Sequence, residues 1–393
     1  MVAMGEVAAG KKKSGAIEVR VFGQTDVGQV REHNEDNFLV ADLTRKSREF
    51  AAGEAHVLGK SGAVFGVCDG MGGAAAGEVA SRLAVDMIYD RLVEAKAPKN
   101  REDLARRLVR AVQDAGVRIF SEARADRSRR GMGTTSTIAT LVDERLFLAQ
   151  VGDSRAYILR DGELTQVTRD QSLVNQLIEA GQLTEEEAET FEHNNIILQA
   201  LGTSDTVQVD LTYVELRKGD ILLLCSDGLS GMVRFEEIRE LLKSSVEPLD
   251  ICKSLTERAN QAGGHDNITV IVVQFDGNSL KPFGAPDEEP LKYRKYTLGD
   301  ESFSDTVPLV GGQPGAPTAG GEVHASDGSI RPPPAVSATS RAPGPWHEQG
   351  AHRAHEHDDR IDIPGTHVPV WMVIGIVVGV VVLLAGTAFL LLR

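Results

Sequence analysis

One stretch of the sequence ends an apolar run in a carboxylate and follows it at once with glycines. Residues 63–68 (Ala-Val-Phe-Gly-Val-Cys) precede Asp69, and Gly70, Gly72 and Gly73 come next. A short apolar run bounded by glycine predicts a buried strand that delivers Asp69 to its exposed end. Because glycine has no side chain, the backbone there can approach a ligand closely. Asp69 is therefore the central candidate for chemistry in this chain.

Four further acids stand in similar contexts: Asp36, Asp153, Asp227 and Asp266. Carboxylates at strand ends along one rim of a sheet can meet in space although they are far apart in the sequence. Oxygen ligands select Mg²⁺ or Mn²⁺, and the absence of clustered histidine and cysteine disfavours zinc. A single Asp-Gly pair is usually a plain turn, as we expect for residues 161–162. The prediction of a divalent-metal centre therefore depends on the whole set of acids.

Composition narrows the functional class. The chain has 393 residues, a net charge of −15 and only 5% aromatic residues. A nucleic-acid binder would need a basic surface or stacking aromatics, so we expect no nucleic acid among the partners. Cys68, Cys225 and Cys252 form no CxxC pair, which disfavours a disulfide framework and indicates a reducing compartment.

Hydrophobic periodicity predicts the elements that position the acids. Two amphipathic helices are expected, one across residues 79–92 and one across 104–119, each with one core face. Strands and helices come in mixed order rather than in strict βαβ alternation, which favours antiparallel sheets covered by helices. The strands are expected at 17–21, 38–40, 63–68, 134–142, 146–151, 156–159, 207–211, 221–225 and 268–275, and further helices at 172–180, 184 onward, 235–243 and 249–262.

Four segments are predicted along the chain. Residues 1–15 read as disordered and 16–276 as one catalytic domain. Only Pro98 and Pro248 of the 15 prolines precede residue 277, so residues 277–367 are predicted to be a flexible linker. Residues 368–393 are predicted to form a C-terminal single transmembrane helix.

The membrane prediction rests on one apolar stretch. Residues 370–392 carry no charge, and at about 1.5 Å per residue they span roughly 34 Å, enough for a bilayer. No apolar segment follows the lysines at 11–13, so no secretory signal is expected. The expectation is a single-pass, tail-anchored protein with a cytoplasmic domain. Gly375 and Gly379 form a GxxxG pattern, so dimerisation through this helix is a hypothesis, against the alternative that glycine is simply common in such helices.

The acids belong to a longer series of motifs. In chain order these are Arg-x-x-Asn-Glu-Asp at 31–36, Asp-Gly-Met-Gly-Gly at 69–73, Gly-Met-Gly-Thr-Thr at 131–135, Gly-Asp-Ser-Arg at 152–155, Ser-Asp-Gly-Leu at 226–229 and His-Asp-Asn-Ile-Thr at 265–269. Residues 17–275 thus resemble the metal-dependent serine/threonine protein phosphatases of type 2C (PPM), in their bacterial form. The resemblance implies an α+β fold, in which a β-sandwich of two antiparallel sheets is flanked by helix pairs in four layers (αββα). It also implies a centre of two Mn²⁺ or Mg²⁺ ions at one end.

The resemblance assigns roles to individual metal ligands. Asp69 would bridge the two ions, and the Gly70 carbonyl would bind one of them. Asp227 and Asp266 would hold the other. Asp153 would bind a third, weaker ion that Asp227 would share.

The remaining roles concern substrate and surroundings. Asp36 and Glu35 match acids in or just behind the ligand shell, and Arg31 matches the clamp on the phosphate. The implied enzyme hydrolyses phosphoserine and phosphothreonine in proteins with a metal-activated water. Its expected partners are phosphorylated proteins at the membrane, including Ser/Thr kinases and their substrates, whose signalling it would counteract.

Two positions depart from the family pattern, and two other functions stay open. Met71 stands where some members carry histidine, so the side chain at this position cannot protonate the leaving group. Gln171 stands at a second position where histidine is frequent. His33, His193 and His265 are more readily explained as solvated side chains than as ligands. One alternative is a catalytically dead domain that binds phosphoproteins as an adaptor. The other is a metal hydrolase acting on phosphorylated small molecules.

Overall fold

A computed structural model describes residues 16–72, 76–189, 191, 193, 195–284 and 290–299 of the chain. The chain divides into two units, Met1–Val307 and Pro308–Arg393, and the second lies wholly outside the described residues. The predicted disordered N-terminus, most of the predicted linker, the apolar segment at 370–392 and the Gly375/Gly379 pair also lie outside them. In the part that is described, no helix has the length and apolar character needed to cross a membrane.

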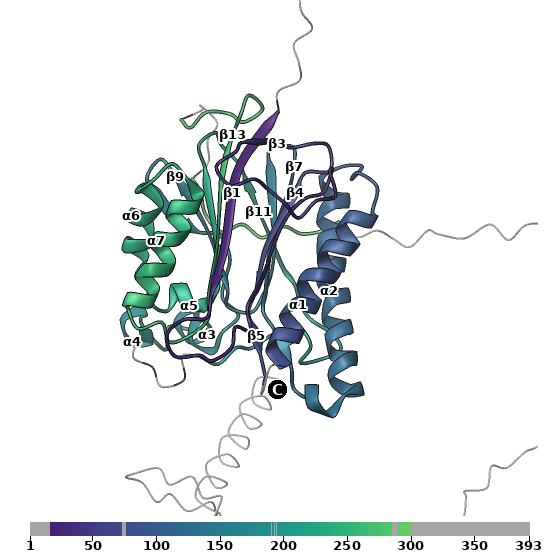
Figure 1. Ribbon diagram of the computed structural model, residues 1–393, viewed down its shortest axis with the longest axis vertical. Helices are drawn as coiled ribbons and strands as arrows, with labels where there is room; N and C mark the ends of the chain where they lie inside the picture. The colour runs from purple at the N-terminus through teal and green to yellow at the C-terminus, as the bar shows by residue number, and fades with distance from the viewer. Residues whose placement is uncertain are drawn as a thin grey trace, which may run out of the picture. The chain divides into compact units, whose positions relative to one another are not determined.

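Two antiparallel sheets form the centre of the domain (Figure 1). One has the strand order β10-β9-β12-β13-β1-β3, the other the order β11-β8-β7-β4-β2, and β5 pairs with β6 in a small separate ladder. The bounds of these strands are β1 (Ile17–Asp26), β2 (Asn37–Asp42), β3 (His56–Val57), β4 (Ala63–Cys68), β5 (Gly70–Met71), β6 (Gly133–Thr134), β7 (Ser136–Val142), β8 (Arg145–Val151), β9 (Arg155–Arg160), β10 (Glu163–Gln166), β11 (Asp210–Glu215), β12 (Ile221–Cys225) and β13 (Ile268–Gly277).

Helices cover the outer faces of both sheets (Figure 1). On one side α1 and α2 share an apolar core with the five-stranded sheet, and on the other α6 and α7 share one with the six-stranded sheet. A third apolar core fills the space between the sheets. The predicted four-layer αββα arrangement is therefore present in the described domain. The helices are α1 (Ala76–Glu94), α2 (Arg101–Ala125), the 3₁₀ turn η1 (Arg127–Arg129), α3 (Leu173–Glu179), α4 (Glu185–Glu189), α5 (Asp227–Ser230), α6 (Phe235–Lys243) and α7 (Pro248–Gln261).

Local sequence signals account for several of these boundaries. Asp161 and Gly162 both have positive φ, 49° and 80°, in the two-residue turn between β9 and β10, as the Asp-Gly hairpin signal predicts. Thr184 and Glu187 exchange the two hydrogen bonds of a capping box at the start of α4. The expected strand at 207–211 differs, since β11 begins only at Asp210. Val207 and Val209 pack instead against the core under α1 and α2.

The stretch assigned to the linker by composition begins with contacts to the domain. Residues 290–299 run beside β11, where Tyr213 N donates to Arg294 O (3.2 Å) and Tyr296 N donates to Leu211 O (2.7 Å). The Tyr296 ring meets Phe147 edge-on at a centroid distance of 5.0 Å, and its hydroxyl donates to Glu102 Oε2 at 2.7 Å. This segment therefore covers the edge of the five-stranded sheet, which would otherwise expose unpaired backbone groups.

Tyr296→Ala should lower the free energy of unfolding by about 2 kcal/mol, because it removes a half-buried ring and its hydrogen bond to Glu102. Denaturant unfolding of the full chain measures this change. Thr297→Ala is the matched control, since Thr297 is the exposed neighbour, and it should leave the midpoint within about 0.5 kcal/mol of the parent. Equal stability of the Tyr296 variant and the parent would show that the segment does not hold the sheet edge in solution.

Candidate metal centre and active site

The five candidate acids come from strand ends at the same end of the sandwich. Asp69 follows β4 and Asp153 follows β8, each within two residues, while Asp36 directly precedes β2. Because Asn37 of β2 pairs with Cys68 of β4, Asp36 and Asp69 are carried to adjacent positions. In the other sheet, Cys225 of β12 pairs with Val270 of β13, which brings Asp227 and Asp266 to the same end. In Figure 1 this is the end at which β5 and α5 lie.

Asp36 is held in place by two hydroxyl groups. Its Oδ2 accepts hydrogen bonds from Ser226 Oγ (2.8 Å) and Thr269 Oγ1 (2.6 Å). The residue is only 4% exposed, and burial raises the pKa of its carboxyl to about 7, although the two hydroxyls oppose that change. Its second oxygen, Oδ1, is buried without a hydrogen-bond partner. One oxygen is thus fixed by the protein and the other is available to a cation.

Asp69 and Asp227 form the centre of the cluster. Their carboxyl groups lie within hydrogen-bonding reach of each other, so a proton on one carboxyl can be held by the other. Burial, followed by the charges of Asp36 and Asp227, raises the pKa of Asp69 well above its ordinary value. Burial and the charge of Asp266 likewise raise the pKa of Asp227. Such a pair of acids is stable as two carboxylates only when positive charge is nearby.

Asp153 completes the row of acids toward β8. Its side chain is 9% exposed, and burial together with the charge of Asp227 raises its pKa to about 7. Its Oδ1 is buried and unpartnered, as is Oδ1 of Asp227. The loop before Asp153 is held by Gln171, whose Oε1 accepts from Gly152 N at 2.9 Å. Gln171 therefore supports the backbone next to the acid where the family pattern has histidine.

Arg31 and Asp266 lie at the open side of the cluster. Arg31 Nη2 donates to Asp266 Oδ2 at 2.8 Å, and the two side chains are 53% and 36% exposed. The hydrogen bond and the charge of Asp266 raise the pKa of Arg31, so the guanidinium stays charged. An exposed guanidinium beside the acids can reach a phosphate group that approaches from solvent.

Glu35 faces α1 rather than the centre of the cluster. The backbone N–H of Gly77, in the first turn of α1, donates to its carboxylate, and burial raises the pKa of that carboxyl. A Cβ on Gly77 would lie 2.6 Å from Glu35 Oε2, and one on Gly70 would lie 2.4 Å from Glu35 O. Only glycine fits at both positions, so the backbone at Gly70 and at Gly77 lies directly against Glu35.

The donor set suits a hard cation that keeps part of its hydration. In the described ranges, no three histidine, cysteine, aspartate or glutamate side chains converge tightly enough to enclose one ion by themselves. Mg²⁺ in proteins commonly keeps several waters and takes only one or two carboxylates. Three buried carboxylate oxygens without partners, on Asp36, Asp153 and Asp227, are the donors that such ions require. The residues present therefore fit a hydrated divalent-metal centre.

Several supporting residues were present in the sequence motifs but received no role from them. Thr134 Oγ1 donates to Asp69 O, and Asp69 N donates to Thr135 Oγ1, at 2.8 and 2.9 Å. Asn267 Nδ2 donates to His33 O, which fixes the segment leading to Asp36. The Gly-Met-Gly-Thr-Thr and His-Asp-Asn-Ile-Thr motifs contained the signal, but only the fold shows which backbone groups their side chains bind.

Comparison with known proteins identifies the family. Residues 51–263 match the family model described as Protein phosphatase 2C. The serine/threonine phosphatase Stp of Listeria monocytogenes is 37% identical over 253 residues, which cover 64% of this chain and 94% of Stp. The phosphatase PstP of Mycobacterium tuberculosis is 37% identical over 269 residues, 68% of this chain and 47% of PstP.

The fold agrees with solved structures of the same group. The catalytic domain of PstP in complex with two manganese ions superimposes with a TM-score of 0.56 at 36% identity, and covers 66% of this chain and 99% of that one. The match of the family model to more than half of the chain agrees with the rim of acids and with the two-sheet fold. The chain therefore belongs to the protein phosphatase 2C family, the metal-dependent protein serine/threonine phosphatases.

Proposed function

We propose that this protein hydrolyses phosphoserine and phosphothreonine in proteins at a centre of two Mn²⁺ or Mg²⁺ ions held by the acids at one end of the sandwich. The observation that carries the proposal is the set of unpartnered carboxylate oxygens on Asp36, Asp153 and Asp227, together with the close approach of the Asp69 and Asp227 carboxyl groups. The PstP structure with two manganese ions supports the same stoichiometry here. When bound, the ions would activate a water for in-line attack on phosphorus.

The protein's own groups would hold the ions and position the substrate. Asp69 would hold both ions, the Gly70 carbonyl would bind one of them, and Asp227 and Asp266 would hold the other. Asp153 would take a third, weaker ion. Thr134 and Thr135 fix the backbone on both sides of the Asp69 carboxylate. Arg31 would turn from Asp266 to the substrate and grip the phosphate oxygens as their charge shifts.

A covalent route through cysteine does not fit the structure. Cys68, Cys225 and Cys252 are all buried, and burial raises the pKa of each thiol to about 12. A thiol of that pKa is almost entirely protonated at neutral pH, and the thiolate is the nucleophilic form. Direct attack by water is the chemistry that the site supports.

Asp69→Asn should lower phosphate release from a phosphothreonine peptide by about a thousandfold, because the central carboxylate supplies several kcal/mol of stabilisation to the metal centre. The assay is run with Mn²⁺ and with EDTA on the full chain. Asp161→Asn, in the β9–β10 turn far from the site, is the matched control and should retain full activity. Turnover that persists in EDTA, or in the Asp69 variant, would rule out the proposed metal mechanism.

Thr269→Val should weaken Mn²⁺ binding by about tenfold, because loss of a partner behind a ligand commonly costs that much. The Thr269 hydroxyl lowers the pKa of Asp36, so its loss raises that pKa above about 7 and leaves less carboxylate at neutral pH. The acid limb of activity should therefore move to higher pH. Mn²⁺ titrations across pH measure both effects.

Thr269→Ser is the control for this variant, since it keeps a hydroxyl at the same position and should behave like the parent. If the Val and Ser variants had the same Mn²⁺ affinity and pH profile, the Thr269 hydroxyl that donates to Asp36 would have no part in preparing the site.

We also propose that residues 370–392 anchor the protein in a membrane as a single-pass tail, with the catalytic domain in the cytoplasm. This rests on the uncharged run in the sequence. A domain tethered through a long linker would meet phosphoproteins at the membrane surface, such as receptor-like Ser/Thr kinases and their substrates, and would counteract them.

Removal of residues 368–393 should move the protein from the membrane fraction to the soluble fraction of cells while peptide phosphatase activity stays unchanged. Membrane sedimentation followed by detection of the chain measures this, with activity as the control for folding. A truncated chain that sediments with membranes as before would place the attachment elsewhere.

A further inference from the structure

Gln171 holds the backbone of Gly152, the residue before Asp153, by both of its polar groups. The Gln171 side-chain Oε1 accepts a hydrogen bond from Gly152 N, and the Gln171 backbone N donates to Gly152 O, both at 2.9 Å. The two residues are 19 positions apart in the sequence. One half-buried side chain and its own backbone thus fix the chain beside the acid for which a third, weaker ion is proposed.

Thr135 confines the same glycine. Gly152 has a φ of 98°, and a Cβ there would lie 2.7 Å from Thr135 Cγ2. Thr135 Oγ1 in turn accepts a hydrogen bond from Asp69 N at 2.9 Å. The turn before Asp153 therefore contacts both Thr135, which supports Asp69, and Gln171.

Gln171 also closes the base of the loop that carries α3 and α4. Its backbone O accepts from Leu198 N at 2.8 Å, and Leu173 N donates to Ile196 O at 2.9 Å. The start and the end of the loop thus pair as antiparallel backbone. In Figure 1, α3 and α4 lie at the same end of the domain as β5 and α5. Gln171 is therefore the residue that joins this loop to the turn before Asp153.

We propose that Gln171 is a positioning residue that couples the ion held at Asp153 to the base of the loop carrying α3 and α4. Glutamine suits this role because its amide oxygen accepts a hydrogen bond and adds no charge beside the acids. Coupling between two sites is reciprocal, so an ion at Asp153 would also stabilise the base of the loop. The inference rests on the proposed function in one respect, the assignment of an ion to Asp153.

Amide hydrogen exchange of the full chain in EDTA tests the contact apart from catalysis. Gln171→Leu removes the side-chain acceptor and should speed exchange at the N–H groups of Gly152 and Leu198 by about tenfold. Gln171→Glu keeps a side-chain oxygen at the same position and should exchange like the parent. Gln182→Leu, the same change at an exposed position between α3 and α4, is the control and should also match the parent. Equal exchange at Gly152 in the Gln171→Leu variant and the parent would overturn the proposal.

Mn²⁺ titration of the same variants tests the effect on the ion. Asp153→Asn identifies the binding step that belongs to the third ion, because that step should be lost in this variant. Gln171→Leu should weaken the same step by about tenfold, as loss of support behind a ligand commonly does, and should leave the tighter steps unchanged. The retained tight steps also show that the variant is folded. An unchanged third step in Gln171→Leu would contradict the proposed role.

Hydrogen exchange with and without Mn²⁺ tests the coupling in the other direction. In the parent, saturating Mn²⁺ should slow exchange at the Leu198 N–H. Neither Asp153→Asn nor Gln171→Leu should show this slowing. Its absence in the parent, or its persistence in either variant, would overturn the coupling.

Turnover of a phosphothreonine peptide by the parent separates this inference from the proposed function. A parent that releases phosphate but shows no link between Mn²⁺ and Leu198 contradicts this inference alone. A parent that shows the link but releases no phosphate contradicts the proposed function alone.

Discussion

Mutual repulsion among carboxylates at one end of the sandwich is the constraint on which the rest of the structure depends. Asp36, Asp69, Asp153 and Asp227 sit in partly or fully buried positions, where each charge destabilises the others. Unpaired charge with little access to water is costly, so the acids must either hold protons or hold cations. The raised pKa values of these acids and their unpartnered carboxylate oxygens both follow from this need for a proton or a cation.

The fold meets this constraint with neutral donors and with rigid strands. Hydroxyl groups of Thr134, Thr135, Ser226 and Thr269 bind the acids or their backbone without adding positive charge that would compete with a metal. Asp170 lies next to this region but is neutralised by Arg155 at 2.7 Å, so it is excluded from the set of available carboxylates. The apolar core between the sheets fixes the strand ends from which the acids project. Strand register thus sets the positions of the acids, and neutral hydrogen-bond partners leave the negative charge of the acids available to a metal ion.

The sequence was sufficient for the acids and for most of the elements, for clear physical reasons. A buried strand needs a continuous apolar run, and an acid directly after such a run must emerge at its end, so Asp69 and Asp227 could be placed by local pattern alone. Their convergence followed from the order of motifs, and strand pairing such as Asn37 with Cys68 now shows it directly. The contact between Glu35 and Gly77 joins residues that are 42 positions apart in the sequence. The hydrogen bond from Ser226 to Asp36 joins residues that are 190 positions apart. No local sequence pattern encodes contacts over such separations.

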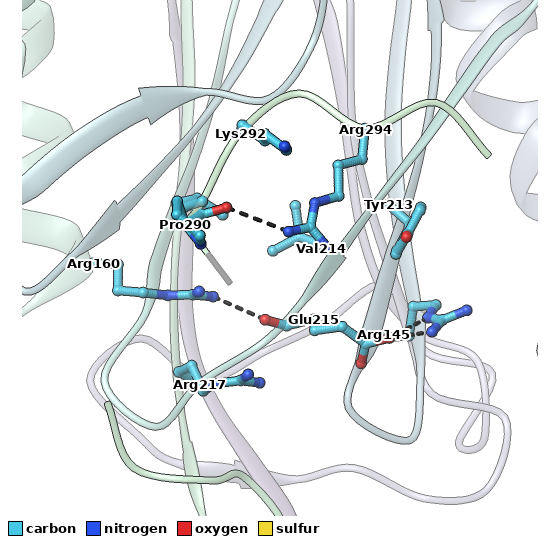
Figure 2. A pocket seen from close by; sticks show the side chains of 10 residues that line it. Arg145, Arg160, Tyr213, Val214, Glu215, Arg217, Pro290, Lys292 and Arg294 are labelled. Atoms are coloured by element: carbon cyan, nitrogen blue, oxygen red, sulfur yellow. Dashed lines mark hydrogen bonds and ion pairs between the residues drawn. The ribbon is translucent and has the colours of Figure 1, made fainter. Parts of the chain in front are cut away.

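Average composition is a poor guide to residues 290–299, where a few side chains decide the structure. Residues 277–367 were assigned to a linker because they are rich in proline and glycine, yet Tyr293 and Tyr296 bind the domain through Asp210 and Glu102. Two aromatic side chains hardly change the average composition of about ninety residues, although they are enough to hold a segment against the edge of a sheet. The same segment lines one side of a cavity of about 270 Å³, opposite Arg160 and Arg217 (Figure 2).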